Sequence, residues 1–245
     1  MIKFLEDTKD NVVNTCYLNF HFQRFKKIAT IVEKLPEKDF KVLDIGPSIF
    51  SQALTKKFSE VDTLGLECDN DNEYGHHYQF DLNNCQNEEK WRKDIGKYDL
   101  IIMTEVIEHI YCAPNFVLRF IKSIMNENCV LVLQTPNAIA LYNRLKMAFG
   151  FTPFELIARG ELTECGHFRE YTKKELEYFI TKECLSIIEI TMENYFDYKY
   201  AFHYDNKTAK KRNYLHIVNL LYEICPSSLK PGITLIAQNR EHSFC

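Results

Sequence analysis

Three ionisable residues lie close together near the middle of the chain, in the run Thr-Glu-Val-Ile-Glu-His at 104–109. If a helical turn begins at Glu105, the residues at i, i+3 and i+4 share one face, and Glu105, Glu108 and His109 would converge. Two carboxylates and an imidazole suit Mg²⁺ or Mn²⁺, and they also suit a general base for a hydroxyl nucleophile. The alternative is a structural role or the positioning of a substrate.

The elements that must position these residues are seven short apolar runs separated by helical segments. The predicted strands are 40–45, 63–67, 78–80, 98–103, 129–134, 185–191 and 232–238. The predicted helices are 17–34, 50–59, 114–126, 138–149, 172–184 and 212–224. This alternation predicts an α/β fold with a Rossmann-like, doubly wound, mostly parallel seven-stranded sheet. We expect the last strand to run antiparallel to the sixth.

Two segments break the alternation, at 138–170 and 192–230. We expect both to pack over the carboxyl edge of the sheet as helical lid insertions. The chain then forms a single domain, 1–245, that begins with an N-terminal helical segment at 1–36. The second insertion is rich in tyrosine, which would pack an acceptor, form a small core or make the contact of a homodimer. These tyrosines are Tyr195, Tyr198, Tyr200 and Tyr204.

Composition narrows the classes of function. The net formal charge is −4 and no basic arm is present, which argues against a nucleic-acid partner. No apolar run approaches the roughly 20 residues that span a bilayer, so no membrane span is expected. The nine cysteines contain no Cys-x-x-Cys pair. Together these features indicate reduced thiols and a cytoplasmic location.

The ends of the predicted strands carry residues suited to a nucleoside cofactor, because ligands bind beyond the carboxyl ends of parallel strands. Gly46 would let the backbone approach a ligand, Glu67 would accept hydrogen bonds from a ribose diol, and Asp81 would hold an adenine amino group. Each carboxylate alone is equally explained as a helix cap. The predicted cofactor-binding residues are Asp44, Gly46, Pro47, Ser48, Glu67, Cys68, Asp81, Leu82 and Thr104.

The ordered set of motifs resembles the class I S-adenosylmethionine-dependent methyltransferase superfamily. The resemblance covers roughly 40–190 and implies S-adenosylmethionine as cofactor. Its motifs are Val-Leu-Asp-Ile-Gly at 42–46, Leu-Gly-Leu-Glu at 64–67, Phe-Asp-Leu at 80–82, the run from 98 to 109, Leu-Gln-Thr-Pro-Asn at 133–137 and Gly-His-Phe-Arg-Glu-Tyr-Thr at 166–172. The chain departs from the family's Gly-x-Gly-x-Gly loop, since residues 46–50 read Gly-Pro-Ser-Ile-Phe. A dehydrogenase is disfavoured because Gly-x-Gly-x-x-Gly is absent.

The Glu-x-x-Glu-His motif resembles that of the ubiquinone O-methyltransferases, in which the corresponding side chains bind a divalent metal. It also resembles the small-RNA 3′-end 2′-O-methyltransferases, which add a later histidine, a role that His167 would fill here. This resemblance implies a metal set of Glu105, Glu108, His109 and His167, with Mg²⁺ or Mn²⁺ as the ion.

The segments at 135–145 and 167–172 are most similar to bacterial methyltransferases of capsule and lipopolysaccharide gene clusters. This similarity implies O-methylation of a sugar or nucleotide-linked sugar, with Glu105, His109 and His167 as candidate catalytic residues. Two alternatives remain open. One is metal-dependent RNA 2′-O-methylation, and the other is a non-catalytic cofactor-binding regulatory subunit, for which the altered glycine loop is the only support.

Overall fold

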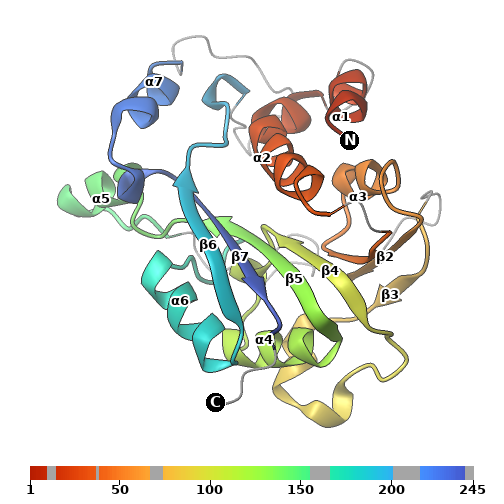
Figure 1. Cartoon of the computed structure of the whole chain (residues 1–245). Helices are drawn as coiled ribbons and strands as arrows, with labels where there is room; N and C mark the ends of the chain where they lie inside the picture. The colour runs from red at the N-terminus through yellow and green to blue at the C-terminus, as the bar shows by residue number, and fades with distance from the viewer. Residues whose placement is uncertain (10–14, 37–38, 67–73, 155–165, 201–215, 241–245) are drawn as a thin grey trace.

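The computed structural model describes residues 1–9, 15–36, 39–66, 74–154, 166–200 and 216–240. A seven-stranded sheet with the order β3-β2-β1-β4-β5-β7-β6 runs through the molecule (Figure 1). The strands are β1 (Lys41–Ile45), β2 (Glu60–Gly65), β3 (His77–Gln79), β4 (Tyr98–Thr104), β5 (Met125–Pro136), β6 (Ser186–Glu193) and β7 (Gly232–Gln238). Neighbours from β3 to β5 pair in parallel, and β7 lies antiparallel between β5 and β6. The predicted Rossmann-like fold with its mostly parallel seven-stranded sheet is confirmed.

The central strands are buried on both faces, which explains their unbroken apolar runs. In β4, the four residues Leu100 to Met103 have no exposed surface. Successive side chains point to opposite faces, so Leu100 and Ile102 join one core while Ile101 and Met103 join the other. The sheet therefore separates two apolar layers.

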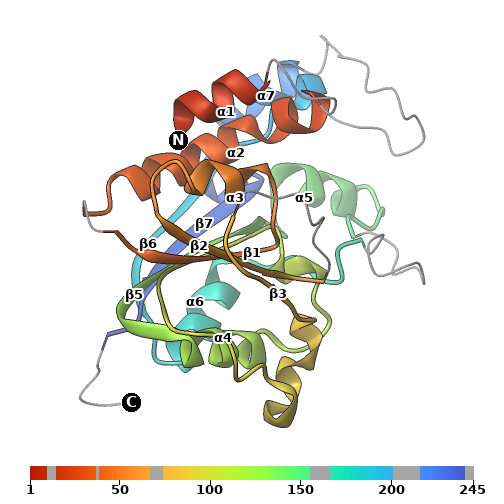
Figure 2. The same ribbon diagram turned by 90° about the vertical axis from the view of Figure 1, so that its right-hand side faces the viewer.

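Helices cover both faces, as Figure 2 shows. Helices α1 to α3 enclose one core, and α4 with α6 enclose the other. The α-helices are α1 (Ile2–Lys9), α2 (Thr15–Glu33), α3 (Ile49–Leu54), α4 (Pro114–Ser123), α5 (Leu141–Ala148), α6 (Lys173–Lys182) and α7 (His216–Ile224).

Local capping signals place two of these helices. Ser48 caps α3, and the Ser51 side chain accepts a hydrogen bond from the backbone of Ser48 in return. Thr172 and Glu175 form the capping box predicted for α6. The caps fix where the chain turns from strand or loop into helix, and the first of them lies at the carboxyl end of β1.

The second predicted insertion packs on the N-terminal helix α2. A 3₁₀ turn, η5 (Tyr198–Tyr200), packs on α2, where the Asp197 N–H donates to the Phe20 carbonyl over 2.9 Å. The Phe20 and Phe196 rings stack with their centroids 5.1 Å apart. The Tyr222 ring of α7 stacks on the Tyr198 ring at 5.6 Å. These aromatic contacts tie α2, η5 and α7 together beyond the carboxyl ends of β4 and β5.

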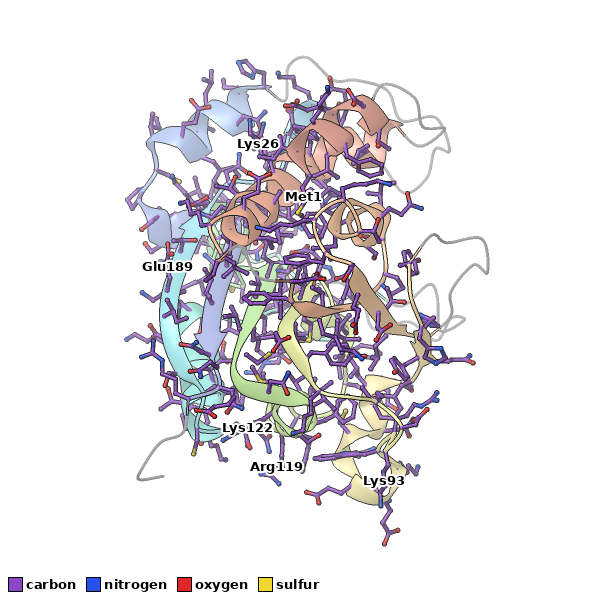
Figure 3. All side chains as sticks on the ribbon, turned by 45° about the vertical axis from the view of Figure 1, so that its right-hand side comes forward. Met1, Lys26, Lys93, Arg119, Lys122 and Glu189 are labelled. Carbon is purple, nitrogen blue, oxygen red and sulfur yellow. The ribbon has the colours of Figure 1, made fainter. Side chains whose placement is uncertain are left out.

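Exposed charged side chains include Lys26, Lys93 and Glu189, which point outward from the ribbon (Figure 3). No described helix has the length and apolarity needed to cross a bilayer. Among the described cysteines, Cys85, Cys112, Cys129 and Cys225 are free thiols. Cys184 is disulfide-bonded, so the expectation of reduced thiols throughout is wrong at this residue.

Candidate functional site

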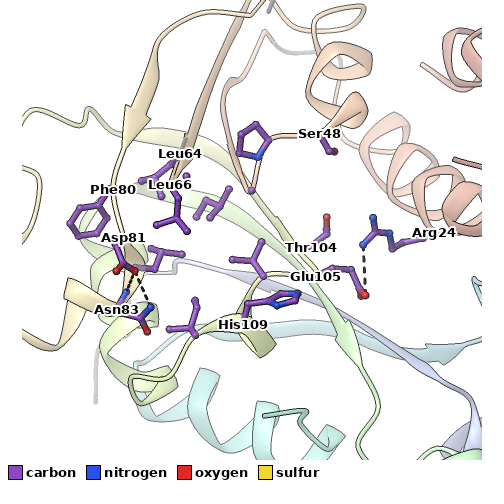
Figure 4. Close-up of a pocket in the computed structure, with 17 residues that line it drawn as sticks. Arg24, Ser48, Leu64, Leu66, Phe80, Asp81, Asn83, Thr104, Glu105 and His109 are labelled. Atoms are coloured by element: carbon purple, nitrogen blue, oxygen red, sulfur yellow. Dashed lines mark hydrogen bonds and ion pairs between the residues drawn. The ribbon is translucent and has the colours of Figure 1, made fainter. Parts of the chain in front are cut away.

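A cavity of about 370 Å³ lies at the carboxyl ends of the first four strands, and we call it the first cavity (Figure 4). Its wall combines the loop after β1, the ends of β2 and β4, and the segment after β3. Seventeen residues line it: Arg24, Ile45, Gly46, Pro47, Ser48, Leu64, Gly65, Leu66, Phe80, Asp81, Leu82, Asn83, Thr104, Glu105, Val106, His109 and Ile110. The predicted residues Gly46, Pro47, Ser48, Asp81, Leu82 and Thr104 are among them. Glu67 and Cys68 lie outside the described residues, and their role stays a prediction.

Asp44 supports the loop after β1 without lining the first cavity. Its side chain is 2 % exposed and accepts a 2.6 Å hydrogen bond from the Ser51 hydroxyl. Burial raises the pKa of Asp44 to about 7, although Ser51 and Arg24 act in the opposite direction. Asp44 thus anchors the start of α3 beneath the loop, and any effect on a ligand passes through Gly46 and Ser48.

The Gly46 backbone requires glycine. Its φ is +82°, a left-handed conformation that residues with a Cβ rarely adopt. A Cβ at this position would also lie 2.6 Å from Cγ2 of Val106. The single glycine of this loop is therefore set by the close approach of the segment after β4.

Asp81 has a structural task as well as a place in the wall. Its Oδ1 accepts from the backbone N–H and the side-chain amide of Asn83, both over 2.9 Å. The Asn83 Oδ1 in turn accepts from the backbone N–H groups of Tyr111 and Cys112. This network ties the segment after β3 to the segment after η3 (Ile107–His109) and gives the far end of the cavity a rigid polar rim.

Arg24 is a lining residue that the sequence did not identify. It projects from α2, is 3 % exposed, and places Nη1 3.8 Å from Oε2 of Glu105 (Figure 4). The only signal in the sequence was a cation among the apolar residues of a predicted helix. Among the described lining residues of the first cavity, Arg24 is the only Lys or Arg.

Glu105 does not start a helical turn, contrary to the expectation that it would share a face with Glu108 and His109. Its φ is +55°, and its N–H donates to the Gln134 carbonyl, so the chain bends sharply at the end of β4. The 3₁₀ turn begins only at Ile107. Glu105 consequently turns toward Arg24. Burial raises its pKa, against the lowering effects of Arg24 and His167.

Glu108, His109 and His167 come together. One ligand atom from each lies within 4.8 Å of the others, and the two imidazole centroids are 4.9 Å apart. Glu108 is fully buried, and its Oε2 accepts from the Thr135 hydroxyl over 2.9 Å. Its Oε1 has no hydrogen-bond partner within the described part of the chain. Burial and the nearby Glu105 raise the pKa of Glu108 to about 8.

His167 reaches this cluster because its segment is held by the backbone. The N–H groups of Phe168 and Arg169 both donate to the Glu108 carbonyl, over 2.8 and 3.2 Å. The His167 Nδ1 lies 3.1 Å from Oε1 of Glu170. A carboxylate only accepts, so Nδ1 carries the proton and a neutral ring keeps its lone pair on Nε2.

A second cavity of about 280 Å³ adjoins the first. Aromatic rings from α2, α5, η5 and α7 line it together with the end of β5. The lining residues are Phe20, His21, Glu105, Pro136, Asn137, Ala140, Tyr142, Asn143, His167, Glu170, Phe196, Tyr198, Tyr222 and Pro231. Of the predicted tyrosines that the structure describes, only Tyr198 lines this cavity. Tyr195 is buried and its hydroxyl donates to the Ile233 carbonyl, and Tyr200 is not a lining residue. Tyr204 lies outside the described residues.

Three side chains connect the cavities. Glu105 lines both, His109 lines the first, and His167 lines the second. The paired imidazoles therefore stand at the boundary, with Glu170 behind His167 on the side of the second cavity. At this boundary, a small chemical group can be transferred from a ligand in one cavity to a ligand in the other.

The sequence pattern of the family described as "methyltransferase domain" matches residues 20–179, more than half of the chain. This protein belongs to that methyltransferase family. The matched range holds every described lining residue of the first cavity. None of the curated proteins compared with this methyltransferase matches it significantly.

Solved structures show the same fold at low sequence identity. An S-adenosylmethionine-dependent methyltransferase from Archaeoglobus fulgidus has a TM-score of 0.55 and 13 % identity, covering 89 % of this chain and 94 % of that chain. Magnesium protoporphyrin IX methyltransferase from Synechocystis PCC 6803, with bound S-adenosylhomocysteine, has a TM-score of 0.55 and 14 % identity. The match covers 94 % of this chain and 89 % of that chain. The N-methyltransferase NodS from Bradyrhizobium japonicum WM9, also with S-adenosylhomocysteine, has a TM-score of 0.53 and 10 % identity. The match covers 98 % of each chain. The fold of this methyltransferase is thus that of S-adenosylmethionine-dependent enzymes.

Proposed function

We propose that this methyltransferase transfers the methyl group of S-adenosylmethionine to a hydroxyl of a sugar or nucleotide-linked sugar, in the synthesis of bacterial capsular or surface polysaccharide. The observation that carries the proposal is the pair of adjoining cavities with His109 and His167 at their boundary. One cavity suits the cofactor and the other an acceptor, and this arrangement supports an in-line transfer of a methyl group between them.

The first cavity suits S-adenosylmethionine at both ends. Leu64, Leu66 and Leu82 provide an apolar bed for adenine next to the polar rim at Asp81. Arg24 offers a buried cation to the methionine carboxylate, at the end where Gly46 brings the backbone close. The sulfonium methyl would then lie between these ends, toward Glu105 and His109. No pyrophosphate needs to be bound, so a single glycine suffices in the loop.

The second cavity suits the apolar faces of a sugar ring, which pack on aromatic side chains such as Phe196 and Tyr198. Asn143 and Glu170 supply polar groups, and the Asn143 amide donates to Oε2 of Glu170 over 3.0 Å. The described lining has two carboxylates and no Lys or Arg. For a nucleotide-linked acceptor we therefore place the sugar inside the cavity and the diphosphate outside it.

His167 is our candidate for the general base. The acceptor oxygen attacks the methyl carbon, the carbon–sulfur bond breaks as the carbon–oxygen bond forms, and the hydroxyl proton passes to Nε2 of His167. The products are the methyl ether and S-adenosylhomocysteine. Glu170 holds the imidazole in the required tautomer through Nδ1 and stabilises the imidazolium that forms.

A metal-assisted variant of this reaction is supported by the cluster of Glu108, His109 and His167. The buried Oε1 of Glu108, which lacks a partner within the described residues, fits a role as metal ligand. Two imidazoles and one carboxylate favour Mn²⁺ over Mg²⁺. When bound, such an ion would lower the pKa of an acceptor hydroxyl. Glu105, the fourth residue of the predicted set, faces Arg24 and stands outside this cluster.

The test combines cofactor binding with turnover. Calorimetry should show that S-adenosylhomocysteine binds the wild type and His167→Gln equally, since His167 does not line the first cavity. Methyl transfer to a panel of sugars and nucleotide sugars, followed by mass spectrometry, should be at least about 100-fold slower in His167→Gln.

The matched control is His76→Gln, because His76 is exposed and lines neither cavity. It should leave both binding and turnover unchanged. Full activity of His167→Gln would contradict the base assignment. Tight cofactor binding without turnover on any acceptor would favour the regulatory subunit instead.

A further inference from the structure

Exposed apolar side chains are concentrated in three segments beside the second cavity. Among the described residues, thirteen large hydrophobic side chains are exposed, and ten of them belong to α5, the following residues 149–154, and α7. We call these three segments the apolar platform. Its exposed members are Tyr142, Leu145, Met147, Phe149, Phe151, Phe154, Ile217, Leu220, Leu221 and Ile224.

Helix α5 projects from the body of the protein (Figure 1) and contributes no buried residue to either core. Phe149 and Phe151 are 76 % and 67 % exposed, and Ile224 is 82 % exposed. Leaving such side chains in water is unfavourable, and an apolar patch of this kind marks an interaction site.

The charge of the platform indicates the kind of partner. Residues 138–154 contain two cations, Arg144 and Lys146, and no acidic residue, although the whole chain has a net charge of −4. The Lys146 ammonium lies 4.6 Å from the Tyr142 ring centroid, so a cation and an exposed aromatic ring share one surface. Helix α7 adds a single acid, Glu223. Aromatic and aliphatic side chains next to cations are typical of segments that lie in a bilayer interface.

The platform also borders the second cavity. Helices α5 and α7 project from the same side of the molecule (Figure 1). They meet where the backbone of Tyr142 hydrogen-bonds the Tyr222 side chain. Both of these tyrosines line the second cavity. A surface that engages the platform therefore lies next to the second cavity.

We infer that the apolar platform docks the protein on an anionic lipid bilayer. The exposed aromatic and aliphatic side chains enter the boundary between headgroups and acyl chains, while Arg144 and Lys146 pair with lipid phosphates. A second copy of the chain is the competing occupant, but two copies of residues 138–154 would bring like charges together. The inference goes beyond the proposed function, and it places the second cavity next to the membrane surface.

Vesicle co-sedimentation of the full chain tests the inference without any methyl transfer, so its failure is distinct from failure of the proposed function. The protein should sediment with phosphatidylcholine–phosphatidylglycerol vesicles at low salt, and weakly with phosphatidylcholine alone. The double variant Phe149→Ser, Phe151→Ser should lower the partition constant at least roughly tenfold, because two apolar side chains are lost. Lys146→Gln should lower it about fivefold.

Tyr178→Ser is the matched control, because Tyr178 is 58 % exposed but lies on α6, which is not part of the platform. It should bind vesicles as the wild type does, and circular dichroism should show that every variant is folded. Three results would overturn the inference. These are no sedimentation of the wild type, equal sedimentation of the double variant, or a dimer that the double variant converts to a monomer in sedimentation velocity.

Discussion

Replacing Gly46 with alanine should destabilise the loop after β1 and weaken cofactor binding with it. A residue with a Cβ in the left-handed conformation found here costs about 1–2 kcal/mol. The added methyl group would also overlap Cγ2 of Val106 at 2.6 Å, and overpacking of this kind costs about 1–3 kcal/mol. We therefore expect Gly46→Ala to lower the free energy of unfolding by about 2–5 kcal/mol.

A double-mutant cycle with Val106→Ala separates the two contributions. Without Cγ2 the overlap disappears, while the backbone strain at Gly46 remains. In the Val106→Ala background, Gly46→Ala should therefore cost only about 1–2 kcal/mol, which gives a coupling energy of about 1–3 kcal/mol. Urea unfolding followed by circular dichroism measures all four proteins, and an unchanged m-value shows that the native state stays compact.

Gly150→Ala is the matched control. Gly150 has a φ of +80°, but a Cβ there would meet no atom within 4 Å. This variant should show the backbone contribution alone and should leave the affinity for S-adenosylhomocysteine unchanged, whereas Gly46→Ala should lower that affinity. The reasoning would be refuted if Gly46→Ala were as mild as Gly150→Ala, or if the Gly46 and Val106 effects simply added.

Two further predictions concern the metal and the pH. If an ion binds Glu108, His109 and His167, EDTA should abolish methyl transfer but not cofactor binding, and Mn²⁺ should restore activity better than Mg²⁺. His109→Ala should lower the rate of methyl transfer by more than about tenfold. Full activity in EDTA would exclude the ion. Burial, then Arg24, lowers the pKa of His21 to about 2. The unfolded state therefore takes up the proton first as the pH falls below 6.5, and folding loses about 2 kcal/mol by pH 5. Unfolding measured at pH 7 and pH 5 should show this loss in the wild type and not in His21→Asn, and equal losses in both would contradict it.

The fold was predictable because its signals are local. The run of apolar residues in β4 reflects burial on both faces, and the capping box at Thr172 and Glu175 needs only four consecutive residues. The predicted residues at the ends of β1, β3 and β4 line one cavity because parallel strands end at one edge. Topology alone brings these positions together once the order of the strands is set.

The prediction from residue spacing was wrong where the backbone departs from a regular helix. The interpretation of Glu105, Glu108 and His109 as one helical face assumed right-handed backbone angles at Glu105. The left-handed φ of that residue turns its carboxylate toward Arg24 instead. Nothing in the local sequence marks this turn, since the constraint comes from the hydrogen bond to Gln134 in the next strand.

The sequence by itself determined the sheet and its helical covering. Each depends on side-chain periodicity or on conformational preferences within a few residues. Only the tertiary structure decided that Arg24 enters the first cavity, that His167 meets His109, and that α2, η5, α5 and α7 enclose a second cavity. Periodicity reports which face of a helix is buried, but it cannot report which distant segment that face will meet. That pairing follows from the packing of the whole chain.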